Sequence, residues 1–388
     1  MFEISSRLAC FSTTIVLLSA GVSVQAQSND PDLDRKRQLM DDRYTIGPSA
    51  AGELGYRIAW QATVDEQEGE LRRVDVVGDD VYAIAPRNRM TRLDRKNGRP
   101  IWTSTVADQL DTIWGVTQSP MRDVPNEDKV YVTTDPVVMV VDNATGAIVG
   151  RQDLERIPST EVIEFGNYLV FGTRSGQIVW HQYLVGQAWK ASQLKGPING
   201  APIRVGNTDI AVASIGGTLL LVDARNARRV WGANLFDGVY TDLASGGGYV
   251  LAASRDQYLW AFDAGNGEVR WRYFTESPLN TPPSVIGERV LQWVPGEGLV
   301  CLQLNPKDTI EGHVLWTIPD ASGNVVGAIR GDALIFDEQQ KKLRIVDMAN
   351  GAVRTSINLP KLRSIQIVGD QIYAVGEGST IQRLDPIH

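Results

Sequence analysis

The sequence predicts an all-β protein, an eight-bladed β-propeller with four antiparallel strands per blade that is closed by an N-terminal strand. Two observations lead to this fold class. A strand-turn-strand unit recurs at a period of about 40 residues through residues 56–388 of the chain. One outer strand near the start of this region has no hairpin before it, and the last unit has no outer strand after it.

The recurring unit is clearest at residues 258–271. Aromatic residues occupy every second position from Tyr258 to Phe262, a period of two that is typical of a strand packed on its faces. Asp263 and the following Ala-Gly-Asn-Gly predict a tight turn, because glycine accepts a positive φ and Asp and Asn bond nearby backbone amides. A second strand then returns and ends at Trp271. The unit is therefore a β-hairpin with a large aromatic residue on its outer strand.

Weaker copies of this hairpin lie along the chain. They occupy residues 92–102, 140–150, 179–189, 221–231 and 345–355, with a truncated copy at 383–385 and a degraded copy around Gln303 that has a longer turn before Trp316. We align the copies on the turn aspartate, here called the anchor, which His181 and Gln303 replace in two copies. The anchors are 38 to 48 residues apart and comprise Asp94, Asp142, His181, Asp223, Asp263, Gln303, Asp347 and Asp385. This period is typical of a propeller or a solenoid.

A further strand pair precedes each hairpin, for example at residues 80–84, 129–132, 249–252 and 371–374. Four short strands per repeat make one propeller blade. The strand at residues 56–60 supplies the outer strand that is missing after Asp385, and so closes the ring. The predicted domain, residues 56–388, allows about 41 residues per blade, as four short strands and their turns require.

Residues 261–271 also carry a resemblance to a known family. They match Ala-x-Asp-x-x-(Thr/Asn)-Gly-(Lys/Glu)-x-x-Trp at every defined position. This pattern resembles the tryptophan-docking motif of propellers related to pyrroloquinoline quinone (PQQ) dehydrogenases. In that family the tryptophan wedges between adjacent blades, which implies this role for Trp60, Trp102, Trp189, Trp231, Trp271 and Trp316. Gly150 and Thr355 replace it in two copies, so we expect those junctions to be held differently.

The resemblance covers residues 56–388 and indicates the fold more specifically than the activity. The same repeat occurs in non-enzymatic scaffolds such as the outer-membrane assembly lipoprotein BamB, because a fold can carry many functions.

Residues 1–26 resemble a secretory signal peptide. Arg7 precedes an apolar run that extends to Val22, and Val24-Gln25-Ala26 provides the small residues that a cleavage site requires. The run is too short to span a bilayer. We therefore expect cleavage after Ala26 and a periplasmic or extracellular mature chain without a membrane span. Residues 27–55 contain Pro, Gly, Ser and mixed charges, which predict a linker or disordered arm with a short helix near residues 34–41.

Charge and cysteine content argue against a nucleic-acid partner and against an internal disulfide. The formal net charge is −8, and the predicted signal contains one acidic and one basic residue, so its removal leaves this charge unchanged. An acidic surface repels phosphate backbones, so we expect no nucleic-acid partner. The mature chain keeps one cysteine, Cys301, in the apolar run 299–302, so an internal disulfide is not expected. Cys301 is predicted to be a small core residue.

No catalytic, cofactor-binding or metal-binding residue is predicted. His181 stands at an anchor, His313 lies in the longer turn and His388 ends the sequence, so no two histidines have the spacing of metal ligands. Asn143-Ala144-Thr145 is a formal glycosylation acceptor, which we expect in an exposed hairpin turn.

The family resemblance implies one enzymatic alternative, a PQQ-dependent dehydrogenase. Such enzymes hold the quinone over an aromatic floor near the ring axis, with a calcium ion and, in many members, a disulfide of adjacent cysteines. This chain has no adjacent cysteines, and its short repeats leave little room for insertions that would cover a cofactor. Trp114, Trp180 and Trp293 lie outside the docking register and are the aromatic candidates for a floor, although strand packing explains them more simply.

We therefore expect a secreted or periplasmic, monomeric and non-catalytic scaffold without a cofactor. Its blades fix many short loops on a rigid disc, which suits binding of an envelope or secreted protein partner. A BamB-like part in envelope protein assembly is the nearest precedent. Two alternatives stay open at this point, the PQQ-dependent dehydrogenase and an envelope glycan-binding module.

Overall fold

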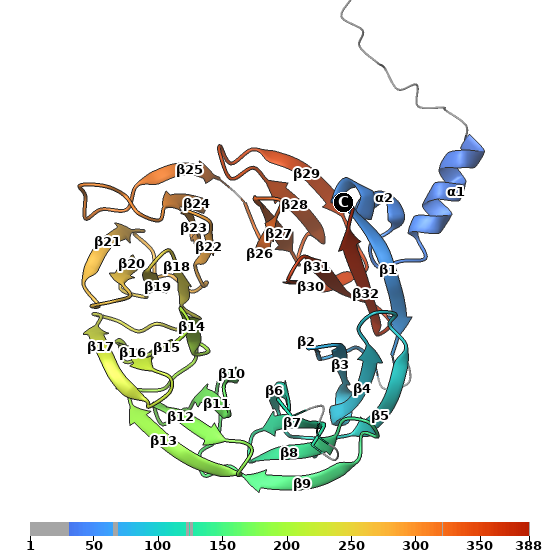
Figure 1. Cartoon of the computed structure of the whole chain (residues 1–388). Coiled ribbons are helices and arrows are strands. Elements are labelled where there is room, and N and C mark those ends of the chain that lie inside the picture. The colour runs from blue at the N-terminus through green and yellow to red at the C-terminus, as the bar shows by residue number, and fades with distance from the viewer. Residues whose placement is uncertain (1–30, 65–68, 122–123, 125–126, 320, 388) are drawn as a thin grey trace, which may run out of the picture.

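The computed structural model describes residues 31–64, 69–121, 124, 127–319 and 321–387. The predicted signal peptide lies outside them. The described chain forms eight four-stranded antiparallel sheets, which confirms the predicted fold class. The sheets surround a central axis as the blades of a propeller, with strands such as β10 and β14 near the axis and β9 and β13 at the rim (Figure 1).

Each blade runs outward in chain order. Blade 1 contains β2 (Arg73–Val77), β3 (Asp80–Ala85), η1 (Pro86–Asn88, a 3₁₀ turn), β4 (Arg89–Asp94) and β5 (Pro100–Thr105). Blade 2 contains β6 (Ile113–Gln118), β7 (Lys129–Thr134), β8 (Val137–Asp142) and β9 (Ile148–Asp153). Blade 3 contains β10 (Ile163–Phe165), β11 (Tyr168–Gly172), β12 (Gln177–Gln182) and β13 (Gln187–Gln193). Blade 4 contains β14 (Ile203–Val205), β15 (Asp209–Ala213), β16 (Thr218–Asp223) and β17 (Arg228–Asn234).

The second half repeats this order. Blade 5 contains β18 (Ala244–Gly246), β19 (Tyr249–Ala253), β20 (Tyr258–Asp263) and β21 (Val269–Phe274). Blade 6 contains β22 (Ser284–Ile286), β23 (Arg289–Val294), β24 (Gly298–Gln303) and β25 (Val314–Ile318). Blade 7 contains β26 (Asn324–Ile329), β27 (Asp332–Asp337), β28 (Lys342–Val346) and β29 (Val353–Asn358). Blade 8 contains β30 (Leu362–Val368), β31 (Gln371–Gly376), β32 (Thr380–Pro386) and, as its outer strand, β1 (Tyr56–Thr63).

The anchor turns form as the sequence predicts. At the end of β20, Asp263 Oδ1 accepts hydrogen bonds from the backbone N–H of Gly265 at 2.8 Å and of Asn266 at 3.1 Å. Gly267 closes the turn with a φ of +76°, a conformation that glycine adopts without steric cost. The outer strand β21 then begins two residues later.

Strand β1 closes the ring. It pairs antiparallel with β32, in a register that places Ile58 opposite Leu384 and Thr63 opposite Thr380. The N-terminal and C-terminal strands of the domain therefore share one sheet, and the ring has no unpaired junction where its two chain ends meet.

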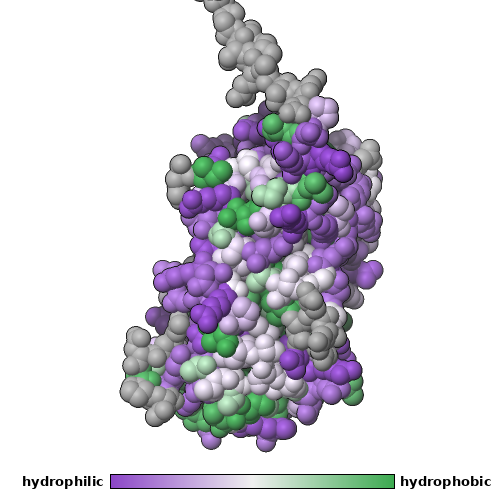
Figure 2. All heavy atoms as spheres, turned by 90° about the vertical axis from the view of Figure 1, so that its right-hand side faces the viewer, coloured by the Kyte–Doolittle hydropathy of each residue, from purple (hydrophilic) through white to green (hydrophobic). Residues whose placement is uncertain are grey.

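The segment before β1 belongs partly to the ring. Helix α1 (Pro31–Asp41) buries none of its residues and lies outside the ring (Figure 1). Figure 2 views the rim from this side, where hydrophobic residues form separate areas among hydrophilic ones. Helix α2 (Pro48–Glu53) and the residues beside it, by contrast, pack against the ring. Ile46, Ala51 and Leu54 are buried in one cluster with residues of blades 7 and 8.

Hydrogen bonds between a side chain of blade 8 and the backbone of Ile46 hold this packed segment in place. The Gln382 side chain accepts a hydrogen bond from Ile46 N at 2.8 Å and donates one to Ile46 O at 2.8 Å. Residues 45–54 are thus built into the domain, which differs from the linker or disordered arm expected for residues 27–55. The reason is that Ile46, Ala51 and Leu54 cover the junction of blades 7 and 8, where Thr355 replaces the docking tryptophan.

Five of the predicted docking tryptophans share one geometry. The indole Nε1 of each donates to the carbonyl of the residue that follows the anchor of the next blade, over 2.7 to 3.1 Å, in the pairs Trp60 with Arg95, Trp102 with Asn143, Trp231 with Ala264, Trp271 with Leu304 and Trp316 with Met348. Four of the rings also cover a turn glycine of that next blade. A Cβ on Gly98, Gly146, Gly267 or Gly351 would lie only 2.5 to 2.8 Å from the ring.

The sixth predicted docking residue, Trp189, does not dock in this way. Its side chain is 42% exposed, and its ring lies against Tyr168 with 4.9 Å between centroids. The turn of blade 3 begins at Gln182 rather than His181, so Lys190 occupies the docking position and lies opposite Trp180, as Trp231 lies opposite Leu221. Trp189 therefore lies one position outside the docking register, where blade 4 has Val230, and Lys190 Nζ instead reaches the turn of blade 4, donating to Asn226 O at 3.0 Å.

At the junction of blades 2 and 3, the docking position holds Gly150 instead of tryptophan, and Gln152 makes the contacts of the missing ring. Gln152 Nε2 donates to Tyr183 O at 2.6 Å, and its side chain lies 3.2 Å from the Cβ position of Gly186. Both contacts are those that a docking tryptophan makes elsewhere. A polar side chain two positions further along β9 thus holds this junction.

The anchor of blade 3 is Gln182, one residue after the predicted His181. Gly186 N bonds Gln182 O at 2.8 Å, as Gly267 N bonds the Asp263 carbonyl at 2.9 Å. His181 instead points into the blade, where it is buried and its Nε2 lies 2.9 Å from Gln152 Oε1. Burial lowers the pKa of His181 to about 4. The sequence alignment was wrong here because neither residue is an aspartate.

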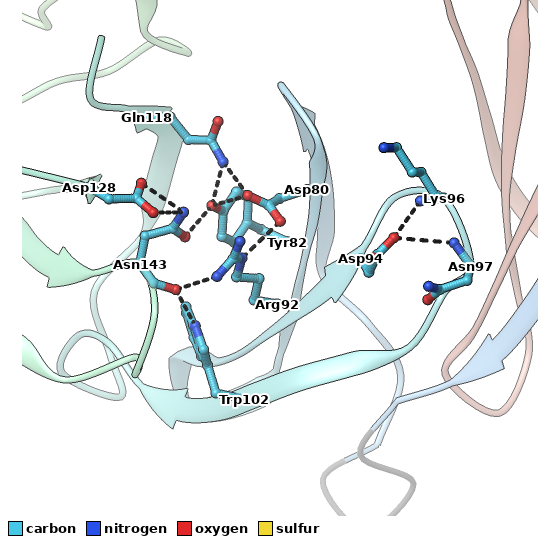
Figure 3. Close-up of polar contacts among 10 residues, drawn as sticks. All are labelled: Asp80, Tyr82, Arg92, Asp94, Lys96, Asn97, Trp102, Gln118, Asp128 and Asn143. Carbon is cyan, nitrogen blue, oxygen red and sulfur yellow. Dashed lines mark hydrogen bonds and ion pairs between the residues drawn. The ribbon is translucent and has the colours of Figure 1, made fainter. Parts of the chain in front are cut away.

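A buried polar network joins blades 1 and 2 (Figure 3). The Tyr82 hydroxyl donates to Asn143 Oδ1 at 2.8 Å and accepts from Gln118 Nε2 at 2.7 Å. Asp80 accepts from Gln118 Nε2 at 2.6 Å and from Arg92 Nε at 2.8 Å. These groups satisfy one another away from water, which is the condition under which a buried polar network stabilises a fold.

Asn143 is the residue of blade 2 on which this junction converges. Its carbonyl accepts from Trp102 Nε1 at 2.7 Å and Arg92 Nη1 at 2.6 Å, and its side-chain Nδ2 donates to Asp128 at 3.0 Å. The residue is fully buried. The expectation of an exposed glycosylation acceptor was therefore wrong for this side chain, because the residue after the anchor lies beneath the preceding blade.

Candidate interaction site

The antiparallel order of each blade divides the loops between two ends of the ring. We call one the crossover end; it carries the connections between blades, such as residues 106–112, 154–162 and 235–243, and the turns between second and third strands. The other, the anchor end, carries the anchor turns. Loops fixed by rigid blades are the usual binding elements of such a fold.

A groove of about 700 Å³ lies at the crossover end, between blades 2 and 3. The lining residues are Thr112, Trp114, Asp135, Glu155, Arg156, Ile157, Pro158, Thr173, Arg174 and Ser175. They come from the connections on both sides of blade 2, from β6 and from the turns that follow β7 and β11. The size lies within the range of 300 to 1,000 Å³ that is usual for ligand-binding clefts.

Hydrogen bonds hold the wall of the groove that blade 2 supplies. Trp114 Nε1 donates to Asp135 Oδ1 at 2.7 Å, and the backbone N–H of Thr112 donates to Asp135 Oδ2 at 3.0 Å. Both carboxylate oxygens of Asp135 are therefore engaged, and the Trp114 indole is fixed beside the groove. A rigid aromatic wall of this kind contributes contact area with little loss of conformational entropy.

The charged residues of the groove differ in their partners. Arg156 donates to Gln177 Oε1 at 2.9 Å and pairs with Glu155 at 3.1 Å. Arg174, in the turn between β11 and β12, is exposed and makes no hydrogen bond or ion pair with any residue that the structure describes. The groove therefore offers one guanidinium group to a ligand.

A second cavity of about 510 Å³ continues from the groove toward the ring axis and shares Thr112 with it. Arg73 crosses it, pairing with Asp75 at 2.7 Å and with Glu161 at 2.9 Å. Burial raises the pKa of Asp75, although Arg73 opposes this shift. This ion-pair cluster is satisfied internally, so it forms a floor rather than a binding group.

Large apolar side chains project from the crossover end. Leu110 is almost fully exposed, Phe236 is fully exposed and Ile157 is 60% exposed. They belong to three different connections between blades, and Leu110 and Ile157 line the two adjoining cavities. Single exposed apolar residues such as Phe236 are common, but two beside adjoining cavities, here Leu110 and Ile157, are typical of an interaction site.

A cavity of about 720 Å³ at the anchor end is less suited to binding. It lies under the long turn between β24 and β25 and is lined by Tyr249, Arg270, Asn305 and Ile310, among others. Its arginine pairs with Asp263 at 2.8 Å, and Tyr249 donates to Asn305 at 2.8 Å. Its polar groups thus bond one another, whereas those of the groove leave Arg174 free.

The three tryptophans proposed as a quinone floor do not lie together in a way that fits a bound quinone. Trp114, Trp180 and Trp293 lie in blades 2, 3 and 6, so no two share a blade. Trp180 is fully buried in the core shared by blades 3 and 4, and Trp293 packs against the core of blades 6 and 7. Among the described residues, no group of three His, Cys, Asp or Glu side chains is placed to hold a metal ion.

The remaining candidates have structural positions. His313 is exposed in the long turn of blade 6, and His388 lies outside the described residues. Cys301 is fully buried in blade 6, which confirms its prediction as a core residue, and burial raises its pKa to about 11. In the part of the chain that the structure describes, no helix is both long enough and apolar enough to cross a bilayer.

Sequence reasoning did not find the groove. Arg174, Ile157 and Leu110 lie in connections that carry no repeat motif, and each is an ordinary loop residue in the sequence. A comparison of the loops position by position could have marked Ile157, since the corresponding residues of the next two connections are Pro197 and Gly238.

Comparison with known proteins agrees with this architecture. The family model described as "Outer membrane protein assembly factor BamB" matches residues 134–278 and 216–376. The chain belongs to this family. A search of the curated proteins found no match.

Solved structures show the same fold at low identity. BamB from Moraxella catarrhalis has a TM-score of 0.66 and 14% identity, over 85% of this chain and 99% of that one. The computationally designed Ika8 protein has a TM-score of 0.63 and 12% identity, over 84% of this chain and 98% of that one. A natural protein and a designed one match almost equally well, so the likeness concerns the fold rather than the site.

Proposed function

We propose that this BamB-family propeller is a non-catalytic, monomeric scaffold of the periplasm or extracellular space, and that it binds another protein at its crossover end. The groove between blades 2 and 3 carries the proposal, because it combines a fixed aromatic wall, the exposed apolar side chain of Ile157 and an unpaired guanidinium group. Tryptophan and arginine in desolvated clefts are typical of the residues that dominate protein interfaces.

Envelope protein assembly is the process that the family description suggests. Three features support a binding role over catalysis. The candidate aromatic residues for a quinone floor lie in separate blades, Arg73 in the inner cavity is paired with Asp75 and Glu161, and the unpaired Arg174 is exposed at the surface. A bound quinone would need a sheltered pocket and a base to accept a proton.

Site-specific photocross-linking tests the location of the interface. We would place a photoreactive amino acid at Ile157, at the crossover end, or at Val185, in the anchor turn of blade 3. These residues are matched controls because they are 60% and 61% exposed. We expect a discrete adduct with one envelope protein from position 157 and none from position 185. Equal adducts from both positions, or none from 157, would contradict the proposed interface.

A second experiment addresses catalysis directly. The mature protein is incubated with PQQ and calcium and then dialysed, and its absorption spectrum and its alcohol-dependent dye reduction are recorded. We expect all quinone to be lost. Retention of one quinone per chain together with substrate-dependent bleaching of the dye would overturn the non-catalytic assignment.

A further inference from the structure

Blade 5 shows how an arginine of the crossover end binds an aromatic ring. Arg255, in the turn between β19 and β20, has its guanidinium carbon 5.0 Å from the centroid of the Tyr240 ring. Tyr240 belongs to the connection that leads into this blade, residues 235–243. A cation at this distance from a ring face is attracted by the quadrupole of the ring.

Arg174 occupies the same position in blade 3. Thr173 and Ser254, the residues before the two arginines, each bond the carbonyl four residues ahead at 3.0 Å. The connections also correspond. Leu154 and Leu235 begin them, and each donates its N–H to the second-to-third-strand turn of the preceding blade, to Pro136 O at 2.9 Å and to Gly217 O at 2.7 Å.

This correspondence places a serine where blade 5 has its tyrosine. Counting from the two leucines, Ser159 is the equivalent of Tyr240. The Ser159 hydroxyl donates to Ile198 O at 2.8 Å, so it does not pair with Arg174. A serine has no ring, so the connection into blade 3 supplies Arg174 with no aromatic partner of the kind that Arg255 has, and Arg174 lines the adjoining groove of about 700 Å³.

We propose that the groove between blades 2 and 3 binds an aromatic side chain of the partner protein, with the Arg174 guanidinium over the ring as Arg255 lies over Tyr240. This inference rests on the proposed function and names the chemistry that the site recognises. Trp114, Ile157 and Pro158 supply apolar walls for the ring, and the volume also accommodates the backbone on either side of it. Aromatic anchors seated in pockets carry much of the energy of protein interfaces.

Peptide titration tests the side-chain preference. The probes are capped pentapeptides Gly-Gly-X-Gly-Gly in which X is phenylalanine or cyclohexylalanine, which have similar shape but differ in the π-system. Dissociation constants for the mature chain are measured from the line broadening of peptide NMR signals. A cation–π contact at a partly exposed site predicts that the phenylalanine peptide binds about 2- to 5-fold more tightly.

Three variants make the test specific. Arg174→Gln should abolish the preference for phenylalanine, because it removes the cation and leaves the apolar walls. Arg225→Gln, an exposed arginine paired with Asp223 at the anchor end, should retain it. Ser159→Tyr should weaken binding of both peptides, because the chain then supplies its own ring. Circular dichroism of each variant verifies that the fold is kept.

The outcomes separate this inference from the proposed function. Equal affinities for the two peptides, no binding of either, a preserved preference in Arg174→Gln, or unchanged binding in Ser159→Tyr would each overturn the aromatic-anchor inference. Cross-linking from position 157 does not depend on Arg174. If position 157 gives an adduct but the peptides or variants contradict the aromatic anchor, the interface at the groove stands and only the preference for an aromatic side chain is rejected.

Discussion

The substitution Gly267→Ala tests the physical basis of blade docking. Gly267 has a φ of +76°, and a Cβ there would lie 2.6 Å from Cδ2 of Trp231. Alanine must therefore hold a left-handed conformation and also displace the ring. Gly287→Ala is the matched control, because Gly287 has a φ of +58° and no atom within 4 Å of the added Cβ. Gly287→Ala therefore has the cost of a left-handed alanine but no collision with a ring.

The expected difference follows from the structure. A left-handed alanine costs about 1 kcal/mol in either variant. Displacing Trp231 also breaks its bond to Ala264 O, which contributes about 1 kcal/mol. If the ring moves from 7% exposure to the 42% of Trp189, it exposes about a third of its surface. For a side chain of about 250 Å² this costs about 2 kcal/mol. Gly267→Ala should thus destabilise by about 4 kcal/mol and Gly287→Ala by about 1 kcal/mol.

Urea unfolding followed by circular dichroism measures these values, provided that the dependence on urea is unchanged between variants. Tryptophan emission should shift to longer wavelength in Gly267→Ala alone, because its ring becomes exposed. Equal destabilisation of the two variants would refute the reasoning, since the collision with Trp231 would then contribute nothing.

Three further predictions concern other junctions. Ala227→Gly should stabilise the protein by about 1 kcal/mol, because it relieves a left-handed alanine, and should leave tryptophan emission unchanged, because Trp189 lies outside the docking register; a loss of stability would count against this explanation. Deleting residues 1–64 removes β1 and should cause aggregation through the open edge of β32. Deleting residues 1–40 keeps Asp41, which bonds Ser49 N of α2, and should leave the melting temperature unchanged. If the variant without residues 1–64 stayed soluble and melted like the parent, ring closure by β1 would be disproved. The folded pKa of His181, about 4, lies below its unfolded value of about 6.5, so the unfolded chain binds more protons between these values and the free energy of unfolding should fall by up to about 3 kcal/mol as pH drops through this window. His181→Leu should flatten that part of the stability profile, and an unaltered profile would show that other groups cause the fall.

The repeat made most of the fold predictable from the sequence. Asp263, the turn glycine and Trp271 act within one hairpin and its neighbour, so a local pattern sufficed to predict the blades. The closing strand followed because one unpaired strand stood at each end of the repeat. Local reasoning failed at blade 3, where Gln182 and His181 are adjacent and neither has the aspartate side chain that marks the turn.

The site and the junctions without tryptophan depend on contacts between distant residues. Ile46 bonds Gln382 across the ring closure, and no sequence pattern reveals that pair. Arg174 differs from Arg255 in having a serine, Ser159, where Arg255 has Tyr240, and this difference is found only when the loops of blades 3 and 5 are aligned. Loop function is thus encoded in differences between repeats, whereas the fold is encoded in what the repeats share.

Hydrogen exchange on the complex with the cross-linked partner tests the central claim most directly. Backbone amides of the full mature chain are compared with and without that protein. The account predicts slower exchange in residues 154–162 and 173–176 at the crossover end, with unchanged exchange in the anchor turns that follow Asp142 and Asp263. Protection confined to the anchor turns, or exchange that is the same in both states, would contradict binding at the groove.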